Sequence, residues 1–274
     1  MRRSTFIIDN FLLFILNFTM AKHLHLEIIG KGRPFILLHG WGWNSSIWQP
    51  LIPQLAENFQ LFLLDLPGFG KSPLITSNYQ IEEIVSALLE ITPAQAIWAG
   101  WSLGGMIAWY IALHYPQRVT NLITIASSPK FVCAENWPGI PAKTLEKFSQ
   151  LLTQNYQKTL QEFLELQLRG SPKSAEWMET LQQKIITPSP HMITALLGGL
   201  KLLRELDLRW ELTQMQCRSL HLFGSNDTLI PVSIAEKIQP LLPQGKSIVI
   251  KKSGHLLFLS QSEIFLQCVQ EFLR

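Results

Sequence analysis

A serine flanked by glycines is the first feature of this sequence that could do chemistry. The segment Gly100-Trp101-Ser102-Leu103-Gly104 follows a short apolar run and precedes a helical pattern. On such a strand-to-helix turn the serine backbone is strained and its hydroxyl stands clear of the chain, while the glycines remove side chains that would clash. We therefore predict a nucleophile at Ser102. The alternative is a glycine-rich turn with an incidental serine.

A serine hydroxyl is a weak nucleophile at neutral pH, so it needs a base and a group that orients the base. His255 follows the apolar run 247–250, and Asp227 follows the run 219–223. Both should lie at the carboxyl ends of strands, where open α/β sheets bind ligands. The chain order serine, aspartate, histidine is typical of one class of hydrolase. We predict a catalytic triad of Ser102, Asp227 and His255.

The base and the acid could each have a simpler role. His255 could be an exposed loop histidine, and Asp227 could only form a turn. Asp207 is the competing acid, but it ends a helical stretch and no strand precedes it. The strand-end position therefore favours Asp227.

Ester hydrolysis also requires donors for the oxyanion of the tetrahedral intermediate. The backbone N–H of Leu103, directly after the serine, is one candidate. The second should come from the loop after an early strand, and His39-Gly40-Trp41-Gly42 fits this position. We expect the oxyanion hole to consist of the amides of Trp41 and Leu103.

The elements that must position these residues alternate between strand and helix. Helical patterns cover Ile81–Ile91 and Leu103–Tyr115. Strands buried on both faces and separated by helices indicate a mainly parallel sheet. The early buried strands are expected at Phe35–Leu38, Leu61–Leu64, Ile97–Ala99 and Leu122–Ala126.

Residues 130–205 lack strand patterns and predict an all-helical insertion. After it, strand and helix alternate again, through Ser219–Phe223, Val232–Ile238, Ser247–Ile250 and Gln261–Leu273. We predict a core of residues 20–129 and 206–274 and a helical cap of residues 130–205 over the active site. The predicted cap helices are Thr144–Leu152, Thr159–Leu168, Ala175–Ile186 and His191–Leu206.

Composition excludes several classes of protein. Of 274 residues, 47% are hydrophobic and 16% charged, which is typical of a chain that folds around a large core. A net charge of +3 without a basic run argues against nucleic acid as a partner. The cysteines Cys133, Cys217 and Cys268 have no metal-ligand spacing, so we expect no metal, and their sparse, odd number favours a reducing cytoplasm.

Residues 1–19 are predicted to be an upstream extension with no role in the fold. The apolar run Phe11–Phe18 is too short to span a bilayer, and Asp9 and Asn10 interrupt the apolar stretch. A secretory signal or a membrane-surface anchor are the alternatives. We expect no stable membrane association.

Taken together, these segments resemble the α/β-hydrolase superfamily over residues 24–274, with Asp65-Leu66-Pro67-Gly68-Phe69-Gly70-Lys71-Ser72 as a further match. Within it, the chain is similar to the pimeloyl-acyl-carrier-protein methyl ester esterases of biotin biosynthesis. The more specific matching segments are Ala96–Gly105, Ala126–Pro129, Trp137–Ile140, Phe163–Gln167 and Gly198–Leu200.

The resemblance implies an α/β-hydrolase fold and cleavage of the methyl ester of a pimeloyl thioester, with loss of methanol. It implies acyl-carrier protein as a partner. We also expect no cofactor, a cytoplasmic location and a monomer. Apolar residues of the cap could supply the slot for the acyl chain, although they could equally be packing residues of a cap helix. By resemblance, the pocket would be lined by Trp41, Ser102, Leu103, Phe163, Leu164, Glu165, Leu166, Gln167 and His255.

The chain departs from the resemblance in its cap charges. The family is expected to hold its acidic carrier protein with cap arginines, and this chain has fewer basic residues there. The corresponding helices carry Lys158, Glu162, Ala175 and Glu179, with Arg169, Lys173 and Lys184 nearby. Recognition of a carrier protein is therefore less strongly indicated than ester cleavage.

Three other functions are compatible with parts of this pattern. A broad carboxylesterase for short-chain esters would use the same triad without a carrier protein. A carbon–carbon bond hydrolase would need polar or cationic groups that the pattern does not place. A non-catalytic binding protein would not require all three triad positions. Ser102 excludes the dehalogenases and epoxide hydrolases of this fold, which need an acidic nucleophile.

Overall fold

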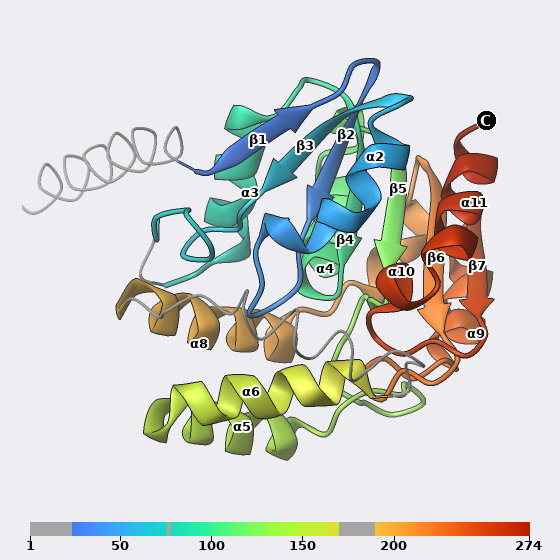
Figure 1. Cartoon of the computed structure of the whole chain (residues 1–274). Helices are drawn as coiled ribbons and strands as arrows, with labels where there is room; N and C mark the ends of the chain where they lie inside the picture. The colour runs from blue at the N-terminus through green and yellow to red at the C-terminus, as the bar shows by residue number, and fades with distance from the viewer. Residues whose placement is uncertain (1–23, 76–77, 170–189) are drawn as a thin grey trace, which may run out of the picture.

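A mostly parallel sheet forms the centre of the protein (Figure 1). The computed structural model describes residues 24–75, 78–169 and 190–274. The predicted extension 1–19 and the predicted helix Ala175–Ile186 lie outside the described residues. Within them the sheet has seven strands in the order β1-β3-β2-β4-β5-β6-β7, and β1 alone is antiparallel to its neighbour. The strands are β1 (Leu26–Ile29), β2 (Arg33–Leu38), β3 (Phe59–Leu64), β4 (Ala96–Trp101), β5 (Val119–Ile125), β6 (Arg218–Gly224) and β7 (Gly245–Ile250).

Helices cover both faces of this sheet, so the predicted α/β architecture is confirmed. Side chains alternate along each strand: Ile36 and Leu38 of β2 face one apolar core, and Phe35 and Leu37 face the other. The first core contains α3 (Ile81–Ile91), α4 (Leu103–His114) and α9 (Ile234–Ile238). The second contains η1 (Ser45–Leu51), α2 (Ile52–Leu55), α10 (Leu257–Ser260) and α11 (Ser262–Leu273). Short 3₁₀ helices lie at η2 (Pro116–Arg118), η3 (Arg209–Gln214) and η4 (Gln239–Leu241).

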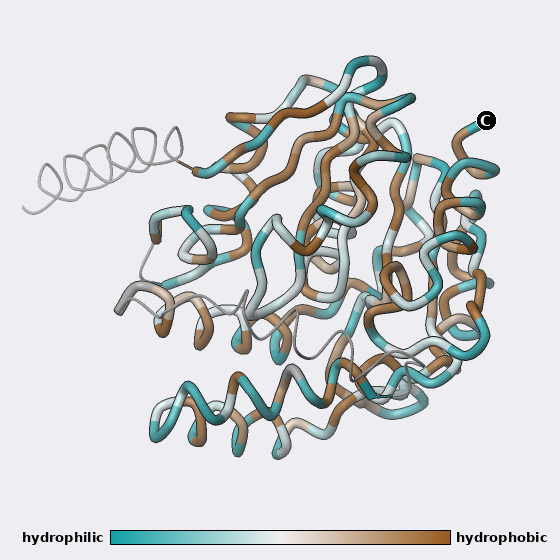
Figure 2. Tube along the Cα trace, in the orientation of Figure 1, coloured by the Kyte–Doolittle hydropathy of each residue, from teal (hydrophilic) through white to brown (hydrophobic). Residues whose placement is uncertain are grey.

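Among the described residues, three α-helices lie between β5 and β6, where the helical insertion was predicted. These are α5 (Ala142–Gln154), α6 (Tyr156–Leu168) and α8 (Pro190–Glu205), and α5 packs against the other two. Figure 1 shows them together beyond the carboxyl ends of the parallel strands. In Figure 2 their hydrophobic residues lie mainly between these helices and towards the sheet.

The two chain segments that join these helices to the sheet lie side by side. Lys130 and Asp207 form an isolated β-bridge, and their side chains form an ion pair of 3.0 Å. Leu208 N–H donates to the carbonyl of Pro129. Partial burial opposes ionisation, but hydrogen bonds from Arg209 and Lys130 lower the pKa of Asp207 to about 2. Asp207 is therefore a structural acid at the base of the helical insertion.

His221 is a buried histidine on β6, and the contacts described below do not include a residue of the predicted triad. Its Nδ1 lies 2.7 Å from Thr124 Oγ1 and its Nε2 lies 2.9 Å from Ser219 Oγ. The ring stacks on the Trp109 indole with centroids 4.3 Å apart. Burial lowers the pKa of His221 to about 3. The folded protein therefore holds this ring neutral, while the unfolded chain protonates it with an ordinary pKa.

This difference predicts a loss of stability in acid. Between the ordinary histidine pKa of 6.5 and the folded pKa of about 3, the unfolded state binds a proton at residue 221 that the folded state does not. Lowering the pH from 7 to 5 should reduce the free energy of unfolding by about 2 kcal/mol through this group. Urea unfolding at both pH values should show a decrease larger by about this amount in the native protein than in His221→Gln. An equal pH dependence in both proteins would refute the assignment.

Candidate active site

Ser102 occupies a strained turn between β4 and α4. Its backbone has φ 54° and ψ −116°, a left-handed conformation that a residue with a side chain rarely adopts. A side chain at Gly100 would collide with the carbonyl of Gly104, and a Cβ at Gly104 would lie 2.5 Å from the carbonyl oxygen of His39. The Ser102 amide donates to the carbonyl of Ile125 at 2.9 Å. The glycines and this hydrogen bond together hold the turn expected of a nucleophile.

His255 and Asp227 are directly paired. His255 Nδ1 lies 2.8 Å from Asp227 Oδ2, and both side chains are 1% exposed. The other carboxylate oxygen, Oδ1, accepts the N–H groups of Leu229 and Ile230 at 2.8 and 3.0 Å. These bonds fix the carboxylate, which then favours a proton on Nδ1 of the histidine. Nε2 is left with a lone pair that can accept a proton.

Trp101 connects the histidine loop to the turn at Ser102. Its indole N–H donates to the carbonyl of His255 at 3.0 Å, and the two rings lie 5.4 Å apart. Trp101 directly precedes Ser102, so the same residue fixes the turn and the histidine loop. His255 Nε2 is buried and has no hydrogen-bond partner, so in this structure it does not bond to Ser102 Oγ. Catalytic hydrogen bonds are often long in free enzymes and shorten when substrate binds.

The two predicted oxyanion donors lie at the start of α4 and on the loop after β2, which pack against each other. Leu103 opens α4, so its amide has no acceptor within the helix and points out of the helix N-terminus. The loop containing Trp41 follows β2, and the carbonyls of Leu38 and His39 lie against Gly104 at the start of the same helix.

His39 holds this loop in place. Its Nδ1–H donates to the carbonyl of Gly40 at 2.8 Å, and its Nε2 accepts the N–H of Leu66 at 2.9 Å. Burial lowers the pKa of His39, which keeps the ring neutral and able to accept that N–H. The arrangement can present backbone donors to an anion beside Ser102.

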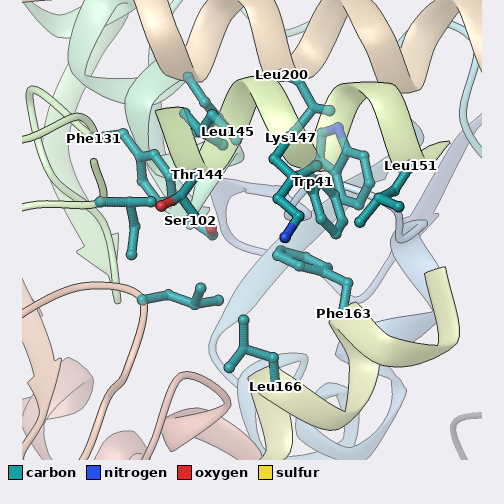
Figure 3. A pocket seen from close by; sticks show the side chains of 14 residues that line it. Trp41, Ser102, Phe131, Thr144, Leu145, Lys147, Leu151, Phe163, Leu166 and Leu200 are labelled. Carbon is teal, nitrogen blue, oxygen red and sulfur yellow. The ribbon is translucent and has the colours of Figure 1, made fainter. Parts of the chain in front are cut away.

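An apolar cavity of about 200 Å³ opens above Ser102 (Figure 3). Of the residues that resemblance assigned to the pocket, Trp41, Ser102, Phe163 and Leu166 line it. The Phe163 ring packs edge-on against the Trp41 indole, with centroids 4.9 Å apart. Its described lining residues come from both the sheet loops and the helices between β5 and β6.

Comparison with known proteins decides the family. Residues 33–261 match the family model described as alpha/beta hydrolase fold. The chain belongs to the α/β-hydrolase family. Solved structures with the same fold include a bromoperoxidase from Bacillus anthracis, with a TM-score of 0.82 and 23% identity over 91% of this chain and 95% of that one. An esterase from Exiguobacterium antarcticum has a TM-score of 0.79 and 23% identity, covering 91% and 94%.

Sequence relatives of this hydrolase are more similar than those structures. A protein of Vibrio cholerae is 38% identical over 92% of this chain and 99% of its own length. A protein of Shewanella woodyi is 39% identical over 93% of this chain and 99% of its own length. Both are named pimeloyl-[acyl-carrier protein] methyl ester esterase, and the α/β-hydrolase fold fits a serine esterase.

Several residues assigned to the pocket by resemblance lie elsewhere in this α/β-hydrolase. Leu103, Glu165, Gln167 and His255 do not line the cavity, and the side chain of Leu164 lies outside the described residues. Five consecutive residues of a helix cannot face one cavity, because they point around the helix axis. Glu165 is accordingly exposed.

Gln167 has a different role from the one that resemblance implied. Its side chain is buried, and its Oε1 accepts the indole N–H of Trp43 at 2.7 Å. Trp43 in turn packs against Trp101, with ring centroids 5.9 Å apart. Gln167 therefore links α6 to the residues that hold the histidine loop.

Sequence reasoning missed most of the cavity wall, which α5 and α8 supply. A signal was present in α5, where Thr144, Phe148 and Leu151 recur with helical spacing. The missed lining residues are Phe131, Ile140, Thr144, Leu145, Lys147, Phe148, Leu151, Leu200, Leu203 and Leu229.

The charged residues of α6 give little basic surface to this hydrolase. Lys158 and Glu162 are both exposed and lie 3.9 Å apart, so one charge offsets the other. Arg169 is exposed at the end of α6. The other cap positions considered, Lys173, Ala175, Glu179 and Lys184, lie outside the described residues.

Metal-ligand clusters and membrane-spanning helices are both absent from the described part of the chain. Within residues 24–75, 78–169 and 190–274, no group of three or more histidine, cysteine, aspartate or glutamate residues is arranged to hold a metal ion. No helix in the same residues has both the length and the apolar character needed to cross a membrane.

Proposed function

We propose that this protein hydrolyses the methyl ester of pimeloyl-acyl-carrier protein to pimeloyl-acyl-carrier protein and methanol, a step of biotin biosynthesis. The observation that carries the proposal is the 2.8 Å pair of His255 Nδ1 and Asp227 Oδ2 beside a serine on a strained turn. Curated relatives with 36–39% identity over most of the chain carry the name of this activity.

The proposed reaction follows from the positions of these groups. Ser102 Oγ attacks the ester carbonyl while His255 Nε2 takes its proton. Asp227 stabilises the resulting imidazolium, and the amides of Trp41 and Leu103 bind the oxyanion. The imidazolium then protonates the departing methoxide, which leaves as methanol. A water molecule, deprotonated by the same histidine, releases the acyl group from Ser102 as a carboxylate.

The cap supports the proposed choice of substrate. We take residues 130–205 as the cap and residues 20–129 and 206–274 as the core. An aliphatic acyl chain fits a cavity whose walls are mainly leucine, isoleucine and aromatic side chains. Burial of the acyl chain in the cavity would also exclude water from the ester while Ser102 attacks it.

The proposed partner is acyl-carrier protein, and the proposed setting is the cytoplasm. The three cysteines are free, which is usual in a reducing compartment. A monomeric state remains our prediction. The weak basic character of α6 favours one further candidate, a broad carboxylesterase for short-chain esters that does not recognise a carrier protein.

Complementation distinguishes these functions. Expression of the protein in a biotin auxotroph that lacks this esterase is expected to restore growth without biotin, and Ser102→Ala is expected not to. Growth failure by a protein that still hydrolyses p-nitrophenyl acetate would support the broad carboxylesterase instead. Failure of both assays would contradict esterase function altogether.

A further inference from the structure

A single positive charge lies in the wall of the cavity. Of the described residues that line it, Lys147 is the only charged one, and Ser102 and Thr144 carry hydroxyl groups. Lys147 and Thr144 are one turn apart on α5, so they share a helix face. In Figure 3 the Lys147 ammonium extends towards Trp41 and Phe163, whereas Ser102 lies in another part of the cavity.

Lys147 is free to bind an anion. It makes no ion pair with any residue in the described part of the chain. No aspartate or glutamate is among the described residues that line the cavity, so none of them competes with an anionic ligand for Lys147. The rings of Trp41, Phe148 and Phe163 contact one another beside it and form an apolar wall. Lys147 is exposed, so a charge pair formed there lies at the solvent-facing rim of the cavity, beside this apolar wall, and is screened as surface ion pairs are.

We propose that Lys147 is a specificity residue that binds a carboxylate at the far end of the acyl chain, so that the enzyme also hydrolyses free half-esters of dicarboxylic acids. The ester lies at Ser102, the aliphatic chain follows the apolar walls, and the distal carboxylate meets the lysine ammonium. This substrate class needs no carrier protein. The inference rests on the proposed esterase function, because it assigns a second substrate to the same serine.

The test compares two esters that differ only at the distal end. Monomethyl pimelate carries a carboxylate there and methyl heptanoate carries a methyl group. The readout is the ratio of their kcat/KM values, which removes general effects of a substitution on the catalytic groups. Lys147→Met is expected to lower this ratio on the order of threefold, as for an ion pair at an exposed position. Lys147→Glu should lower it further through repulsion, whereas Lys147→Arg should preserve it.

Two controls separate a local contact from a general effect of charge. Lys143 is a lysine on the same helix that does not line the cavity. Lys143→Met should keep the native ratio. The shorter pair, monomethyl succinate and methyl butanoate, should respond less to Lys147→Glu, because the carboxylate cannot extend as far from Ser102.

The outcomes are distinguishable from failure of the proposed function. A ratio in Lys147→Glu equal to the native ratio would overturn the role of Lys147, as would an equal decrease in Lys143→Met. Absence of turnover of both the charged and the neutral ester by the native protein would instead overturn the esterase function itself.

Discussion

Substitution of Ser102 by alanine is expected to lower kcat for p-nitrophenyl acetate by about 10⁶-fold, the scale measured when the nucleophile is removed from other triads. The reason is geometric. The turn with φ 54° presents the hydroxyl at the edge of the sheet, and the glycines at positions 100 and 104 leave no other side chain there. Without Oγ no acyl-enzyme can form at residue 102, and His255 has no hydroxyl proton to accept there.

The fold should survive this substitution, since Ser102 donates no side-chain hydrogen bond that the structure describes. Steady-state kinetics together with thermal unfolding test both statements. Ser149 on α5 is a matched control. Its hydroxyl donates to the carbonyl of Leu145, and the residue does not line the cavity. Ser149→Ala should retain native turnover. Wild-type-like hydrolysis by Ser102→Ala would refute the assignment of the nucleophile.

Asp227→Asn is expected to lower kcat by about 10⁴-fold with little change in KM, the size of effect known for this change in a triad. Asparagine is almost isosteric with aspartate and can still accept the N–H groups of Leu229 and Ile230. Its amide group, however, would donate to His255 Nδ1 and so place the ring proton on Nε2. The histidine could then no longer take the proton of Ser102.

Asp207→Asn provides the control for this prediction, because Asp207 is the competing acid in the sequence. It pairs with Lys130 and Arg209 at the base of the helical insertion. We expect Asp207→Asn to lower the unfolding temperature and to keep kcat within about twofold of native. The reverse pattern, with activity lost in Asp207→Asn and kept in Asp227→Asn, would reassign the acid.

The strands and long helices could be predicted from sequence because their signals are local. A run such as Leu61–Leu64 marks the buried part of β3, and the helical pattern Ile81–Ile91 coincides with α3. The predicted strands were short at their amino ends, where Arg33 and Phe59 begin β2 and β3. The short helices η1 and α2 were missed, because helices of this length and with Pro50 and Pro53 show no 3.6-residue period.

For the candidate site, the triad could be proposed from the sequence but the cavity wall could not. Ser102, Asp227 and His255 could be proposed from sequence because each follows a strand, and parallel strands bring their carboxyl ends to one edge. The cavity wall could not, because it depends on how α5, α6 and α8 pack. The stretch 163–167 was assigned as a block, yet Gln167 bonds to Trp43 and Glu165 is exposed. Which side of a helix faces a cavity is set by tertiary packing.

Labelling with a fluorophosphonate, followed by peptide mass spectrometry, tests the central assignment most directly. Such a reagent phosphonylates a serine, with loss of fluoride, where a base activates the hydroxyl and donors hold the phosphonyl oxygen. We predict a single adduct, on Ser102, that is absent in His255→Gln and in the unfolded protein. An adduct on another residue, or none on the folded native protein, would contradict the account.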